Sequence, residues 1–190
     1  MMSKKELIVQ SAIDLFQEQG IDKTTISDIV KRANIAQGTF YIYFPSKLAL
    51  MPALAEEMVK VLMEHIGSKV EAAQSIKEKL TNIVDAIFTV NEQYPEVLAV
   101  VYSGLASTEH LKQWETVYEP CYEMISQLIE EAIDNGEITT KLSPKRTAKL
   151  IIGLVESAAE QVYLYDHSEE TEVKKQQEAV LQFLFAALKL

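Results

Sequence analysis

Apolar side chains recur along this chain at the spacing of an α-helix almost from end to end. In the first predicted helix they stand at Ile8, Ala12, Leu15 and Phe16, which share one face. Gly20 is expected to end that helix as a left-handed C′ residue. No segment shows the strict alternation of a half-buried strand, so the pattern predicts an all-α fold.

Capping residues place two further helices close behind the first. Thr25 is an N-cap candidate for a second helix, with Asp28 three residues on as a short form of the capping box. Asn34 can adopt the left-handed conformation of a tight turn, and a short third helix is predicted over about 38–44. Three helices of these lengths, the last two joined by a short turn, indicate a helix-turn-helix arrangement.

The rest of the chain predicts six more helices, about nine in all. A fourth runs from Ser46 to about residue 68, and Pro52 marks either a kink or a late start. The others are expected at about 75–93, 95–108, 111–135, 144–165, and from Ser168 or Thr171 to the C-terminus.

Composition supports a helical, intracellular protein. With 190 residues, 48% of them hydrophobic, the chain can bury a core, and six glycines and five prolines are few for a loop-rich sandwich. The longest conspicuous charge-free stretch, 97–108, is short of the ~18 apolar residues that a membrane span needs. The N-terminus has no signal-peptide pattern, so a cytoplasmic protein without membrane contact is expected.

The charge is unevenly distributed. The net charge is −10, but residues 1–47 carry six basic and five acidic side chains, a net of +1. The acidic remainder repels nucleic acid, so DNA binding is permitted only at the N-terminal end.

Signals of catalysis are absent from the sequence. The three histidines, His65, His110 and His167, are scattered without metal-ligand spacing, and no phosphate-binding or nucleophile motif occurs. The single cysteine, Cys121, is expected to be a packing residue. The sequence therefore predicts no enzyme, no cofactor and no metal site.

The segment from Gly20 to Lys47 resembles the DNA-binding signature of the TetR family of bacterial transcriptional regulators, above all in Gly38-Thr-Phe-Tyr-x-Tyr-Phe-x-Ser-Lys47. The resemblance implies a helix-turn-helix DNA-binding domain over 1–47 and a helical effector-binding and dimerisation domain over 48–190. The segment departs from the family pattern at Asn34, which replaces a glycine, and at Ala36, which replaces a frequent serine. Pro45 and Leu48 also replace commoner polar residues.

The resemblance assigns roles to individual residues of the N-terminal segment. Backbone contacts to DNA are implied for Thr25, Gly38, Tyr41, Tyr43 and Lys47. Base contacts are implied for Gln37 and Thr39, and Ile42 can meet a thymine methyl group. Simpler interpretations remain open: Tyr41 as a core residue, Lys47 as a solvated side chain, and Thr25 as a helix cap alone.

Two C-terminal helices are apolar on more sides than a single core requires. A four-helix interface between two copies of the chain would bury both, as the family resemblance implies. The predicted interface residues are Ile151, Leu154, Leu181, Leu184, Phe185 and Leu188.

Aromatic and acidic residues gather in the C-terminal half and suggest an effector site. The candidates are Tyr102, Trp114, Tyr118, Tyr122 and Glu156. Aromatic rings with a carboxylate would suit a lipophilic or aromatic effector, including a cation. The alternative is that the tyrosines fill a core and the glutamates form a solvated face.

Together these features predict a homodimeric regulator, a repressor that a small effector releases from a palindromic operator in double-stranded DNA. A helical small-molecule carrier or sensor without DNA binding is the alternative, and a helical enzyme without recognisable motifs is a third possibility.

Overall fold

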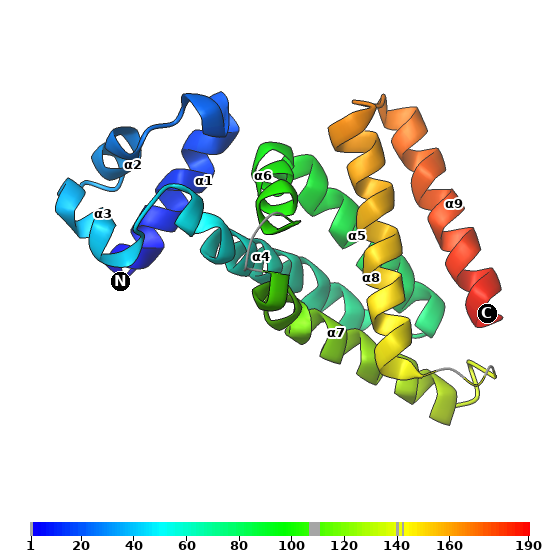
Figure 1. Ribbon diagram of the computed structural model, residues 1–190. Helices are drawn as coiled ribbons and strands as arrows, with labels where there is room; N and C mark the ends of the chain where they lie inside the picture. The colour runs from blue at the N-terminus through cyan, green and yellow to red at the C-terminus, as the bar shows by residue number, and fades with distance from the viewer. Residues whose placement is uncertain (1, 107–110, 140, 142) are drawn as a thin grey trace. The chain divides into compact units, whose positions relative to one another are not determined.

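The computed structural model describes residues 2–106, 111–139, 141 and 143–190, and within them the secondary structure is helical throughout (Figure 1). The nine α-helices of this part are α1 (Lys4–Lys23), α2 (Ile26–Arg32), α3 (Gln37–Tyr43), α4 (Met51–Ala72), α5 (Ile76–Gln93), α6 (Pro95–Ala106), α7 (Leu111–Asp134), α8 (Pro144–Glu160) and α9 (Glu170–Leu188). A 3₁₀ turn, η1 (Leu48–Leu50), precedes α4, and a π-helical turn, η2 (Gln161–Tyr165), follows α8. The all-α prediction is confirmed. Among the described helices, none is both long enough and apolar enough to cross a membrane.

The chain packs as two compact units. The first unit contains residues 1–58 and 94–117, and the second contains residues 59–93 and 118–190. Helix α4 therefore begins in the first unit and continues into the second. The predicted division at residue 47 is a division by function, which these packing units do not test.

The first unit is built on the apolar face of α1. Ile8, Ala12 and Phe16 are fully buried, as the helical spacing predicts. Helix α1 packs against α2 and also against α6, which comes from much later in the chain. The helix-turn-helix thus rests on α1, and α6 supports the same helix.

Capping and turn chemistry set the ends of α2 as predicted. The Thr25 side chain accepts a hydrogen bond from the Asp28 backbone N–H, and the Asp28 side chain accepts one from the Thr25 N–H, which completes the capping box. Asn34 lies between α2 and α3 with φ of +51°, the left-handed conformation that a side-chain amide tolerates.

Three helix ends differ from the prediction. Gly20 has φ of +77° but ψ of 161°, so it is an extended break and not a left-handed cap, and one more turn follows to Lys23. Pro52 is the second residue of α4, which marks a late start after η1 and settles the open alternative. Helix α9 begins after Glu169, and no side chain caps it, so neither Ser168 nor Thr171 has the expected role.

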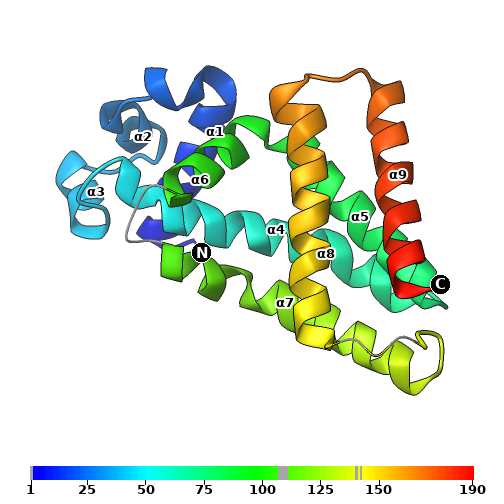
Figure 2. The ribbon, with the colours of Figure 1, turned by 45° about the vertical axis from the view of Figure 1, so that its right-hand side comes forward.

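The second unit is organised around α5, which packs against both α8 and α9. Leu80, Ile83 and Ile87 bury the inner face of α5, and Ile151 and Val155 bury that of α8. Helices α8 and α9 lie side by side and run in opposite directions, as Figures 1 and 2 both show.

Candidate DNA interface and effector site

Helix α3 has one buried face and one exposed face. Phe40 is fully buried and Phe44 nearly so, and Phe40 meets the Tyr41 ring edge-on with 5.6 Å between ring centroids. On the other face the exposed fractions are 79% for Ile42, 49% for Tyr41 and 43% for Tyr43. Tyr41 is therefore not a core residue, and α3 presents a row of large side chains to solvent.

The start of α3 is open. Gln37 and Gly38 are exposed and Thr39 is half-buried. A Cβ atom added at Gly38 would meet no atom within 4 Å, and Gly38 has no positive φ. Nothing inside the described structure therefore requires glycine at this position.

The hydroxyl and the backbone N–H of Thr25 both form hydrogen bonds with Asp28 of α2. Its hydroxyl donates to Asp28 Oδ2 at 2.6 Å and accepts from the Asp28 backbone N–H at 3.2 Å. These bonds lower the pKa of the Asp28 carboxyl, since the hydroxyl and backbone donors stabilise its charged form. The geometry supports the capping role, and a phosphate contact by Thr25 stays a prediction.

Lys47 makes contacts that the sequence did not suggest. Its Nζ donates to the backbone carbonyl oxygens of Ile21 at 2.6 Å and Thr24 at 2.8 Å. The interpretation of Lys47 as a merely solvated side chain is therefore wrong, because its amine is bound to the end of α1. Whether it also touches a phosphate stays a prediction.

A second basic side chain of the first unit is also held internally. Both terminal nitrogens of Arg32 donate to the Glu18 carboxylate at 2.6 Å. The Arg32 guanidinium lowers the pKa of Glu18 chiefly through this hydrogen bond. The pair ties α2 to α1 across 14 positions of sequence, and no local spacing rule would have found it.

In the second unit, three of the five predicted effector residues come together. The Tyr118 hydroxyl donates to Glu156 Oε1 at 2.5 Å, and the rings of Tyr118 and Tyr122 lie 5.9 Å apart. Both tyrosines are buried, and Lys149 Nζ sits 5.1 Å from the centroid of the Tyr122 ring. This group, Tyr118, Tyr122, Lys149 and Glu156, joins α7 to α8 and is called the tyrosine–glutamate cluster below.

The carboxyl group of Glu156 lies in an unusual environment for a glutamate. Burial raises its pKa to about 8, although the hydrogen bond from Tyr118 acts in the opposite direction. The carboxyl is therefore mostly uncharged at neutral pH, so it offers hydrogen bonding more than negative charge to a ligand.

The other predicted residues are not members of this cluster. Tyr102 is half-buried in α6, within the first unit. The side chain of Trp114 lies outside the described residues. Cys121 is buried, its Sγ donates to Met63 Sδ at 3.4 Å, and burial raises the pKa of its thiol to about 12, all of which fit a packing residue. No group of three or more potential metal ligands occurs in the described part of the chain.

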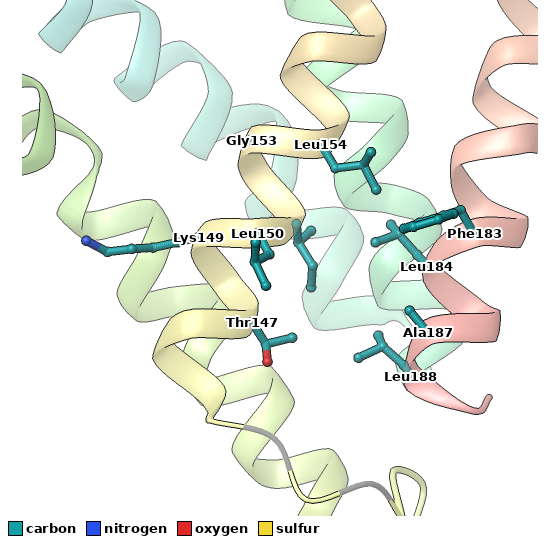
Figure 3. Close-up of a pocket in the computed structure, with 10 residues that line it drawn as sticks. Thr147, Lys149, Leu150, Gly153, Leu154, Phe183, Leu184, Ala187 and Leu188 are labelled. Carbon is teal, nitrogen blue, oxygen red and sulfur yellow. The ribbon is translucent and has the colours of Figure 1, made fainter.

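An apolar groove of about 530 Å³ runs between α8 and α9 (Figure 3). Four of the predicted interface residues, Ile151, Leu154, Leu184 and Leu188, line it. Figure 3 shows Leu154, Leu184 and Leu188 in the space between the two helices, and Lys149 pointing away from it. Leu181 is half-buried, and Phe185 instead lies beneath Lys77 of α5, with Nζ 5.5 Å from its ring centroid.

Two large, exposed apolar side chains of this groove were not among the predicted interface residues. Leu150 is 73% exposed and Phe183 is 63% exposed, and both line the groove. Their positions on otherwise apolar helices were the available signal, but periodicity could not tell an outer face from an inner one.

Comparison with known proteins identifies the class. The first 50 residues form a helix-turn-helix of the kind used by DNA-binding regulators, and residues 8–54 match the family described as bacterial regulatory proteins, tetR family. Residues 80–188 match the tetracyclin repressor-like C-terminal domain. The chain belongs to the TetR family of transcriptional regulators, which are not enzymes.

A curated relative supports this assignment. An uncharacterized HTH-type transcriptional regulator of Bacillus subtilis, YvdT, is 40% identical over 175 residues, which are 92% of this chain and 90% of that protein. Two solved structures share the fold. FadR of Bacillus subtilis in complex with stearoyl-CoA has a TM-score of 0.76 and 21% identity, covering 94% of this chain and 96% of that one. FadR of Thermus thermophilus in complex with lauroyl-CoA has a TM-score of 0.75 and 20% identity, covering 95% of this chain and 93% of that one.

Proposed function

We propose that this protein is a homodimeric repressor that binds a palindromic operator through α3 and leaves it when a small effector binds. The observation that carries the proposal is the exposed row on α3. Ile42, 79% exposed on a short helix between two half-exposed tyrosines, packs little against the described residues. Such a face suits the major groove, where an apolar side chain meets thymine methyl groups.

The proposed division of labour on this face follows the chemistry of each side chain. Gln37 can bond bidentately to adenine, and Thr39 can bond to several bases. The Tyr41 and Tyr43 hydroxyls can donate to phosphates, which positions the helix without reading sequence. Gly38 allows a phosphate to approach the backbone at the start of α3.

A gel shift with matched variants tests the proposed role of α3. Ile42→Glu places a negative charge against the polyanion and should reduce operator binding at least a hundredfold. Tyr165→Glu introduces the same charge at a side chain that is 67% exposed, in η2 of the second unit. Equal binding by both variants would refute the role of α3. Failure of the wild-type protein to retain any DNA would favour the alternative, a carrier or sensor without DNA binding.

The proposed dimer forms through α8 and α9. A groove lined by Leu150, Gly153, Leu154 and Phe183 exposes apolar surface that a second copy of the same helices would cover. A four-helix interface of this kind would also bury Ile151, Leu184 and Leu188 more deeply. Two-fold symmetry of the dimer would match a palindromic operator.

The proposed effector is a small lipophilic or aromatic molecule that binds in the second unit near the tyrosine–glutamate cluster. Two relatives of similar fold were solved with stearoyl-CoA and lauroyl-CoA. Long-chain acyl-CoA thioesters are therefore the first compounds to test. Because Glu156 is mostly neutral at pH 7, the cluster favours a ligand with hydrogen-bonding groups over one that needs a fixed negative partner.

Binding can be measured through Trp114, the only tryptophan of the chain. An effector that quenches the Trp114 fluorescence should lower the affinity of the protein for its operator. Saturating operator DNA should lower the affinity for the effector by the same factor. A ligand that binds equally with and without operator is not the switch.

We place the functional division at residues 1–47 and 48–190, and we expect the protein to act in the cytoplasm, where it meets the chromosome.

A further inference from the structure

The amine of Lys47 closes a contact between two distant parts of the first unit. Lys47 immediately precedes η1, the turn that leads into α4. Its Nζ reaches back 26 residues to the Ile21 carbonyl and 23 residues to the Thr24 carbonyl. These two carbonyls belong to the corner where α1 ends and α2 begins, here called the α1–α2 corner (residues 21–25).

The chemistry of the corner explains why an ammonium group binds there. The last carbonyl groups of a helix lack helical partners and carry the negative end of the helix dipole. An ammonium group has three donors and no acceptor, so one lysine can serve two carbonyls at once with charge-assisted bonds. Gly20 interrupts α1, so Ile21 and Thr24 belong to the short turn after this break, and the Lys47 amine adds donors to two of its carbonyls.

Besides Lys47, the described hydrogen bonds of the corner run to α1 through Thr24 and to α2 through Thr25. Thr24 is 1% exposed, its hydroxyl donates to the Gly20 carbonyl at 2.8 Å, and its backbone N–H donates to the Ile21 carbonyl at 3.2 Å. These bonds of Thr24 stay within α1 and its end. Lys47 supplies the described bonds that join the corner to the start of α4. Thr25, which follows Thr24 in the corner, is the N-cap of α2.

We propose that Lys47 is a positioning residue that clamps the start of α4 to the α1–α2 corner and so sets where α2 and α3 stand. A displacement of the α4 start would pass through this amine to the first residue of the helix-turn-helix. The proposal rests on the proposed DNA-binding function but differs from a phosphate contact, because the clamp exists without DNA.

The test compares Lys47→Met with Lys5→Met in the full-length protein. Methionine keeps an aliphatic stem and removes the amine, and Lys5 is an exposed lysine of the same unit outside the corner. Amide hydrogen exchange is measured first without DNA. Lys47→Met should accelerate exchange of the Thr24, Asp28 and Ile29 amides at least tenfold, while Lys5→Met leaves them near wild type. Unchanged exchange in Lys47→Met would overturn the proposal.

Salt-dependent operator binding separates the clamp from a phosphate contact. A clamp role predicts about tenfold weaker binding at every salt concentration, with an unchanged slope of log K against log salt. A phosphate contact alone predicts a slope smaller by ~0.9 per subunit with normal exchange in the free protein, and that combination would overturn the proposal.

If Lys47→Met does not fold, Lys47→Gln takes its place, and a variant with no faster exchange at the same amides would overturn it equally. Failure of the wild type to bind DNA would refute the proposed function and leave the exchange result decisive for the clamp.

Discussion

At the scale of single residues, the surroundings of a side chain separate structural roles from roles that need a partner. Thr25, Arg32 and Lys47 are polar residues of the first unit that all bind groups within it. Ile42 and Gly38, in contrast, have features that nothing in the described structure uses. Residues of the second kind are the better candidates for DNA contact.

Gly38→Ala tests this distinction. The added Cβ has free space, and alanine favours a helix by roughly 1 kcal/mol over glycine, so stability should stay equal or rise. Operator binding should fall, since the methyl group would stand where a phosphate approaches the backbone. Thermal unfolding and a gel shift check the two expectations. An alanine variant that binds operator like wild type would remove Gly38 from the interface.

Glu156→Gln tests the state of the buried carboxyl. The folded pKa of about 8 lies above the ordinary value of 4.5, so the folded protein holds the proton more tightly than the unfolded chain. Stability should therefore fall as the pH rises from about 4.5 to 8, by on the order of a few kcal/mol. The glutamine variant has no proton to lose and should show a flatter dependence in urea unfolding at pH 5.5 and 8. Identical slopes for both proteins would show that Glu156 has an ordinary pKa.

At the scale of helices, the sequence predicted elements better than it predicted faces and ends. Thr25, Asp28 and Asn34 act locally, so their capping and turn roles could be inferred from neighbouring residues. The prediction for Gly20 was wrong, and the turn after it is bonded by Thr24 and by Lys47, a residue too distant in sequence for a local rule to include. The packing of α6 on α1 was equally out of reach, since no local pattern encodes a contact between residues so far apart.

That packing changes how a signal can reach the helix-turn-helix. Helix α4 follows the helix-turn-helix in sequence and continues into the second unit, so it is one covalent route between them. Helix α6 offers a second route, because it contacts α1 directly and is joined in sequence to α5 and α7. An effector could therefore act on α1 without moving α4 first.

The α8–α9 pair provides the prediction for assembly. Leu184 is 4% exposed within its own chain, so a charge there would disturb the core as well as any interface. Leu150→Glu and Phe183→Glu change exposed side chains of the groove and should leave the helix content intact. Each should convert the proposed dimer to monomer, because an unpaired charge buried in an interface costs several kcal/mol. Light scattering measures the mass, with Tyr165→Glu as the control, and a dimeric Leu150→Glu variant would place the interface elsewhere.

At the scale of the whole molecule, charge is divided between a nearly neutral N-terminal end and an acidic remainder. Residues 1–47 carry a net charge of +1 and the remaining residues −11, so DNA can approach productively only at the helix-turn-helix. Two copies joined through α8 and α9 would present two such ends to one DNA duplex. The sequence recognised would then have two-fold symmetry.

Selection of DNA from a random pool by the purified protein tests whether two copies bind a symmetric operator. We expect enrichment of an inverted repeat whose half-sites lie about one helical turn of DNA apart, ~34 Å, or a multiple of it. Gln37→Ala should relax the preference at one base position in each half-site and leave the others unchanged. Enrichment of no sequence, or of a single site without symmetry, would contradict the account.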